Sequence, residues 1–259
     1  MINNIRYQAL SLLLLFPMLL AGCAQPALTE QTAKIEPPMA PMYPINEYVK
    51  PDVVYVVDDV YDPLEGFNRS MYTFNYYFDK YLFLPVVNGY EFITPNYVED
   101  RVSCFVDNIL EFNNFINNFF QLDPKGTGIT LLRFVVNSTV GIGGFWNPAT
   151  DMGLLRQTEN FGQTLGHYGV GNGPYLVLPV LGPSNLRDTA GFGVDLLAFG
   201  YYGPPAWISE TAWGWSFVGV AAIDRRHRQS FRYYQSGSPF EYEMIRMLYT
   251  TKREIEISE

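Results

Sequence analysis

Apolar residues recur at three- or four-residue steps through most of the chain after residue 62, which is the spacing of helices that bury one face. The periodic segments are 63–84, 96–120, 129–140, 185–199, 209–234 and 239–251. Pro85 should end the first helix, because a proline disfavours helical geometry in the residue before it. Asp123, followed by Pro124, should cap the helix that contains 129–140. The pattern therefore predicts a mainly α, single-domain protein.

The polar faces of the first two predicted helices carry few charges. Tyrosines fill these positions in the first helix, and the second uses asparagines: Asn108, Asn113, Asn114, Asn117 and Asn118. Helices that are apolar or aromatic on more than one face can lie in a protein core or at a lipid interface. The residues by themselves favour the core. No segment of the mature chain offers the about 20 uninterrupted apolar residues of a simple transmembrane helix.

Glycine and proline dominate the segment 160–183. The pair Asn172-Gly173 suits a type I′ turn, and Pro174 cannot donate a ladder hydrogen bond, so a short irregular Gly/Pro hairpin is expected here. Gly169, Gly171 and Gly173 imitate part of a phosphate-binding loop but lack its Lys-Ser/Thr ending, which favours backbone freedom as their role. His167 is expected to make a structural hydrogen bond.

The N-terminus has the order of an export signal: Arg6, an apolar stretch, two small residues and then Cys23. The ending Leu-Ala-Gly-Cys resembles a bacterial lipobox, which implies a signal peptide at 1–22 and a lipid-modified Cys23. Ala24 is not the aspartate that favours inner-membrane retention, so the implied address is the periplasmic face of a Gram-negative outer membrane. Residues 23–61 are expected to form a Pro-rich tether, 62–250 the helical domain and 251–259 a tail.

Composition narrows the functional classes. The 259 residues are 48% hydrophobic and 17% charged, with a formal net charge of -9, which argues against disorder and against nucleic-acid binding. Neither G-x-S-x-G nor H-E-x-x-H occurs, and two cysteines and two histidines offer no motif for a metal site. We therefore expect no catalytic residues, metal or cofactor, with a lipid hydrolase as a minor alternative.

A basic island lies near the C-terminus of the 209–234 segment, with Arg225, Arg226, Arg228 and Arg232 around His227. Cations there suit the negative end of a helix dipole on a solvated face. The alternative is attraction to lipid phosphates or to an acidic partner.

Several motifs, in the same order, resemble the MlaA family, also called VacJ. The first run is Asp62-Pro63-Leu64-Glu65-Gly66-Phe67-Asn68-Arg69, and the second is Gly141-Ile142-Gly143-Gly144-Phe145. The third extends from Thr158 through Gly169, and continues with Gly173-Pro174-Tyr175, Leu178-Pro179, Gly182-Pro183-Ser184 and Leu186-Arg187-Asp188. The resemblance covers about 60–240.

The resemblance implies a helical ring that lies within the outer-membrane bilayer and encloses a polar-lined channel. It therefore favours a lipid environment for the apolar helix faces, whereas composition by itself favoured a buried protein core. Family members remove mislocalised phospholipid from the outer leaflet, pass it to a soluble periplasmic carrier and often associate with trimeric porins. We therefore expect a phospholipid channel that maintains lipid asymmetry and is not an enzyme. The alternative is a structural, porin-associated lipoprotein without transport activity.

In such a channel, the loop of residues 166–179 is a candidate gate. Its key positions are His167, Gly169, Gly171, Gly173, Pro174 and Tyr175. Glycine hinges beside an apolar run would make a flap, and the alternative is a static brace. At the start of the domain, Phe67 is expected to anchor packing and Asn68 to satisfy nearby backbone.

Overall fold

The computed structural model describes residues 60–204 and 211–258, and for residues 211–215 it describes the backbone alone. The signal peptide, Cys23 and the tether up to residue 59 lie outside the described residues. The described helices are α3 (Glu65–Phe78), α4 (Leu84–Ile93), α5 (Asn96–Phe120), α6 (Pro124–Thr139), α7 (Pro148–Asp151), α8 (Phe161–His167), α9 (Leu186–Tyr202), α10 (Thr211–His227) and α11 (Glu241–Ser258). The mainly α prediction is confirmed.

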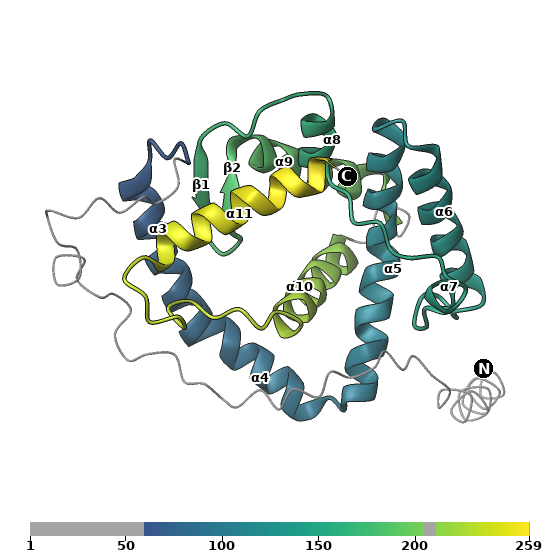
Figure 1. The fold of residues 1–259 in the computed structure, drawn as a ribbon. Helices are drawn as coiled ribbons and strands as arrows, with labels where there is room; N and C mark the ends of the chain where they lie inside the picture. Colours follow the sequence, from purple (N-terminus) through teal and green to yellow (C-terminus); the bar gives the residue numbers. More distant parts are fainter. Residues whose placement is uncertain (1–59, 205–210, 259) are drawn as a thin grey trace, which may run out of the picture.

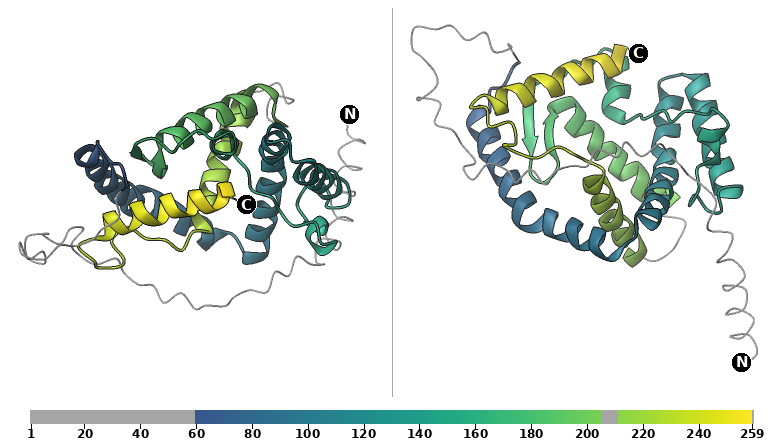
Figure 2. Two further views of the ribbon diagram at one scale, coloured as in Figure 1. Left: turned by 45° about the horizontal axis from the view of Figure 1, so that its top comes forward. Right: turned by 60° about the horizontal axis from the view of Figure 1, so that its bottom comes forward.

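The helices are arranged as a ring in projection (Figure 1). Helices α3, α4 and α5 run one after another along an arc, and α11 passes along the opposite side. Helix α10 lies inside this outline, whereas α6 and α7 flank α5 on its outer side, an arrangement that the further views in Figure 2 also show. Among the described residues, none of the helices combines the length and apolarity needed to cross a bilayer.

The first helix does not end at Pro85, contrary to the prediction. A π-helical turn, η2 (Asp79–Phe83), joins α3 to α4, and the amide of Leu84 donates to the carbonyl of Asp79 five residues earlier. Pro85 then falls in the first turn of α4, where the amide that it lacks would have no helical partner. The wide turn and the proline together bend the chain without interrupting it.

Helices α5 and α6, both predicted from the sequence, pack against each other. Helix α5 spans Asn96–Phe120, the range expected from its periodicity. Asp123 caps α6 as predicted, because its carboxylate accepts hydrogen bonds from the amides of Lys125 and Gly126 at 3.0 and 2.9 Å.

The hairpin exists, but its turn is not at Asn172-Gly173. Strand β1 (Tyr175–Leu178) pairs antiparallel with β2 (Gly182–Asn185), so the turn lies at residues 179–181. Val180 adopts a left-handed φ of 69° there. His167 also differs from expectation, since it is the exposed last residue of α8 rather than part of a glycine loop.

The last helix is longer than its apolar periodicity predicts. Helix α11 continues to Ser258, so the stretch 251–258 is not a separate tail. The reason is that its second half is held by polar contacts, which a hydrophobic pattern does not report. Helix α9 likewise runs through Gly200 to Tyr202.

Two small clusters hold most of the buried apolar side chains of the described chain. One gathers Tyr72, Tyr175, Val177 and Tyr242 between α3, β1 and α11. The other gathers Val106, Phe199 and Phe217 between α5, α9 and α10. Most of the remaining interior is polar.

Candidate functional site

The polarity of the molecule is inverted relative to an ordinary soluble domain. Fully buried side chains include Arg133, Glu111, Asn68, Asn75 and Asn117. Large apolar side chains are exposed on all the long helices, with Phe92 at 90% exposure and Ile93 at 76%. So many exposed large apolar side chains are unusual for a soluble monomer, and large exposed apolar surfaces mark contact with a membrane or a protein partner. The candidate site is therefore the polar interior together with its apolar outer face.

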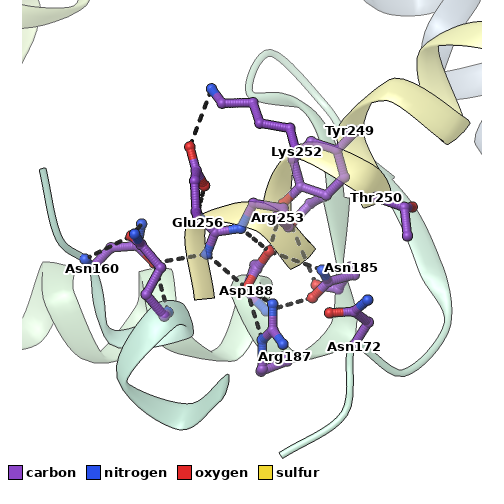
Figure 3. A network of polar contacts seen from close by, with 12 residues as sticks. Asn160, Asn172, Asn185, Arg187, Asp188, Tyr249, Thr250, Lys252, Arg253 and Glu256 are labelled. Atoms are coloured by element: carbon purple, nitrogen blue, oxygen red, sulfur yellow. Dashed lines mark hydrogen bonds and ion pairs between the residues drawn. The ribbon is translucent and has the colours of Figure 1, made fainter. Parts of the chain in front are cut away.

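One polar network centres on Asp188, at the start of α9 (Figure 3). Arg253 of α11 donates to both its carboxylate oxygens, at 2.7 and 3.0 Å, and Tyr249 donates at 2.7 Å. Arg187 donates at 3.0 Å and Asn185 at 2.8 Å. Burial by itself would raise the pKa of Asp188, but the hydrogen bonds and charges of Arg253, Tyr249 and Arg187 hold that pKa below its ordinary value.

This network joins α11 to two segments that belong to the sequence motifs, α8 and the start of α9. Asn160 caps α8 and its side-chain oxygen accepts from Arg253 at 3.0 Å, so α8, α9 and α11 meet at Arg253. Gly162 of α8 faces Gly191 of α9 so closely that a Cβ on Gly191 would lie 2.3 Å from the Gly162 amide nitrogen. These motif residues therefore fix how three elements pack.

The asparagine face of α5 forms a second network, directed at α8 and α9. Asn117 donates to Asp195 at 2.9 Å and accepts from Thr164 at 3.0 Å, and the Phe161 amide donates to Asp195 at 2.8 Å. Burial raises the pKa of Asp195 despite the hydrogen bonds from Asn117 and Phe161. Uncharged amides at this face let α5 bury polar groups with few unpaired charges.

A buried ion pair joins α5 to α6. Arg133 donates through Nε to Glu111 at 2.7 Å, and both side chains are almost fully enclosed. Arg133 also donates to Thr150 and to the carbonyl of Leu154, which ties the α7 segment to the pair. Breaking such a pair would leave an uncompensated charge in the interior.

The motif at the start of the domain lies against the hairpin. Asn68 donates to Asp62 at 2.7 Å and to the Tyr175 carbonyl at 3.0 Å, and accepts from the Val177 amide at 2.9 Å. Arg69 pairs with Glu65 and Glu243 and lies 4.4 Å from the Tyr242 ring centre. Pro63 is exposed, and Phe67 is 53% exposed. Phe67 is thus not the packing anchor that we expected, because the helix turns Asn68 inward instead.

The candidate gate divides into an open part and a fixed part. Gly169 and Gly171 are exposed with open space around them, and Gly169 and Gly173 have φ of +83° and +67°. The Pro174 carbonyl accepts from the Leu186 amide at 3.0 Å, and Tyr175 is buried. The apolar run 175–178 is a strand in the core, which agrees with a brace better than with a flap.

The basic island forms ion pairs within the chain. Arg226 binds both oxygens of Asp79 at 2.7 Å, and Arg228 binds both oxygens of Asp107 at 3.0 Å. His227 contacts Glu91 at 2.8 Å. These pairs connect α10 and the residue after it to η2, α5 and α4, so Arg226, His227 and Arg228 position a helix, whereas Arg225 is exposed to solvent. The sequence did not reveal these partners because each lies more than a hundred residues away.

A small polar pocket of about 310 Å³ opens where the start of the domain meets α11, lined by Val60, Tyr61, Asn172, Gly173, Tyr175, Asn185, Thr250, Thr251 and Glu254. The described residues contain no cluster of three or more His, Cys, Asp or Glu side chains that could hold a metal ion.

Comparisons with known proteins agree on one family. A family model described as MlaA lipoprotein matches residues 60–256. An uncharacterised protein of Rickettsia prowazekii is 43% identical over 130 residues, which cover 50% of this chain and 52% of the relative. The match thus spans about half the length of that relative.

The "Intermembrane phospholipid transport system lipoprotein MlaA" of Escherichia coli is 36% identical over 194 residues, which cover 73% of this chain and 75% of the relative. A solved chain from work on the structural basis for maintenance of bacterial outer membrane lipid asymmetry superposes with a TM-score of 0.61 at 32% identity, and covers 76% of this chain and 98% of its own length.

Proposed function

Because the chain belongs to the MlaA lipoprotein family, we propose that it removes mislocalised phospholipids from the outer leaflet of the outer membrane and passes them to a soluble periplasmic carrier. In this role it maintains lipid asymmetry as a transport component rather than as an enzyme. The names of its relatives, an intermembrane phospholipid transport lipoprotein and a structure concerned with lipid asymmetry, support the proposal.

The observation that carries the proposal is the inverted polarity. A phospholipid needs a polar path for its headgroup and an apolar surface for its chains. The buried amides and ion pairs of α5, α8 and α9 would supply the first, and the exposed aliphatic and aromatic side chains would supply the second. In lipid, helices also satisfy their own backbone hydrogen bonds.

The finer parts of the proposal concern placement. We propose that the body lies in the bilayer, that Cys23 carries the lipid anchor on the periplasmic side, and that a trimeric porin is its partner in the membrane. An apolar outer face offers contact area both to acyl chains and to a porin wall. Within the interior, we propose that Asp62 and Asn68 hold the loop of residues 166–179 in place through the contacts of Asn68 with Tyr175 and Val177.

The test is complementation in a Gram-negative strain that lacks its own family member. The full chain should lower the amount of phospholipid in the outer leaflet, measured by labelling from outside the cell, and Cys23→Ala should not. Transfer of labelled phospholipid to a periplasmic carrier separates transport from a purely structural, porin-associated role. Unchanged outer-leaflet phospholipid would contradict the proposal, and cleavage of the lipid ester would favour a hydrolase.

A further inference from the structure

Arg101 differs from the other buried arginines of the described chain. Arg133, Arg187, Arg226 and Arg253 each form an ion pair with a carboxylate. Arg101 is only 5% exposed, yet its Nε and Nη1 have no hydrogen-bond partner among the described residues. Burying a cation without a counter-charge costs folding free energy, and an anion bound at Arg101 would offset that cost.

The neighbours of Arg101 on α5 and in the loop after α6 are aromatic. The guanidinium lies 4.9 Å from the ring centre of Tyr97, one helical turn earlier, and 5.6 Å from that of Trp146. Aromatic faces hold the cation in place without neutralising it. The Tyr97 hydroxyl is also enclosed and has no partner among the described residues. The side chains of Tyr97 and Arg101 thus present three donor atoms without a partner, and of these only the Tyr97 oxygen can also accept a hydrogen bond.

We propose that Arg101 and Tyr97 bind a phosphate group, and that its source is the phosphodiester of a phospholipid. Phosphate oxygens accept hydrogen bonds from arginine in the fork geometry of the guanidinium. Water could satisfy single donors but would leave the charge uncompensated.

The surface around this corner favours a lipid over a free phosphate ion. Helix α4 ends at Ile93 and α5 begins at Asn96, and the corner exposes Phe92, Ile93 and Val98. A phospholipid would cover this apolar surface with its chains while its phosphate meets Arg101, whereas inorganic phosphate would use only the arginine. The lipid assignment rests on the proposed function, but binding of a phosphate does not.

The experiment measures thermal unfolding of the purified full chain in a maltoside detergent while dihexanoyl phosphatidylglycerol is added. A ligand that binds the folded state raises the melting temperature. We expect a concentration-dependent rise for the wild type and an apparent affinity at least about tenfold lower for Arg101→Gln. Arg225→Gln is the matched control, because it removes the same charge from an exposed position on α10.

Two further ligands identify the source. Dihexanoylglycerol, which lacks the phosphate, should give no rise that depends on Arg101. If inorganic phosphate protects the wild type as well as the lipid does, the lipid assignment is wrong. Tyr97→Phe, which removes one donor and keeps the ring, should weaken the response less than Arg101→Gln, and it serves as the second variant if Arg101→Gln does not fold.

Equal responses of the wild type and Arg101→Gln, or no response of the wild type to any phosphate compound, would overturn the inference. The readout is independent of transport. A chain that lowers outer-leaflet phospholipid but binds identically with Arg101→Gln refutes the site alone, and a chain with an Arg101-dependent phosphate response but no transport refutes the function alone.

Discussion

The amide of Val177 donates to Oδ1 of Asn68 at 2.9 Å, although the two residues are 109 positions apart in the chain. Nδ2 of the same asparagine donates to the Tyr175 carbonyl at 3.0 Å. Asn75, two helical turns later, repeats the arrangement with the Leu178 carbonyl at 2.9 Å and the Val180 amide at 2.6 Å. The edge of β1 that β2 leaves free is therefore paired with side chains of α3 in place of a third strand.

Replacing Asn68 should show how much the pairing of α3 with β1 contributes to the free energy of unfolding. Asn68→Ala leaves the Val177 amide and the Tyr175 carbonyl buried without these partners, which should cost about 1–3 kcal/mol of unfolding free energy for each unsatisfied group. Denaturant unfolding in detergent measures the loss. Phe67→Ala, at the exposed neighbouring position, should cost less than about 1 kcal/mol. Equal stability of the two variants would contradict this role of Asn68.

Deleting Phe67 and Asn68 together should do more than remove the pairing. The loss of two residues rotates the helix on one side of the deletion by about 200° relative to the other, so Asp62, which accepts from Arg246, and Asn75, which donates to the Leu178 carbonyl, can no longer both meet their partners. We expect a misgated channel and an outer membrane sensitive to detergent. Growth in detergent and outer-leaflet phospholipid measure the effect, and wild-type values for both would refute it.

The end of α11 should be essential for stability. Arg253→Ala leaves Asp188 without its strongest partner in a buried network, which should cost about 3–5 kcal/mol. A chain that ends at Thr251 should lose at least as much. Lys252→Ala is the matched control, since its ion pair with Glu256 is exposed and contributes less than about 1 kcal/mol. An unfolding midpoint that both arginine removal and truncation leave unchanged would restore the view of 251–259 as a tail.

Stability should fall in acid partly through Asp188. Its pKa is lower in the folded protein than in the unfolded chain, so its contribution is complete above the ordinary aspartate pKa and is lost as the pH falls through the folded value. Asp188→Asn should therefore flatten the acid limb of the curve of unfolding free energy against pH. Parallel acid limbs for wild type and variant would show that other carboxylates control this limb.

The loop of residues 166–179 can be tested with two glycines that differ in backbone geometry. Both Gly169 and Gly171 have room for a methyl group, but Gly169 has a φ of +83°. Gly169→Ala should destabilise by about 1–2 kcal/mol and Gly171→Ala by much less. If the loop is a brace, Gly171→Ala should transport labelled phospholipid at the wild-type rate. A slowed rate with unchanged stability would indicate a hinge.

Local signals in the sequence determined much of the secondary structure. The 96–120 periodicity and the Asp123 cap act within a few residues of the chain, so the sequence predicts both. The family, too, follows from motifs that are contiguous in the chain. The same signals failed at Pro85 and at Asn172-Gly173, because a π turn and a hairpin turn with Val180 at positive φ depend on what packs against them.

Only the tertiary structure decided which polar residues meet. Arg226 pairs with Asp79, 147 positions away, and Arg253 pairs with Asp188, 65 positions away. Local spacing in the sequence therefore predicts neither pair. Periodicity reports which face of a helix is apolar but not whether that face turns inward or outward. In this protein asparagines and ion pairs fill the interior and many large apolar side chains face outward. Many of these buried polar groups find hydrogen-bonding partners in distant segments that the fold brings together, as Asn117 does with Asp195.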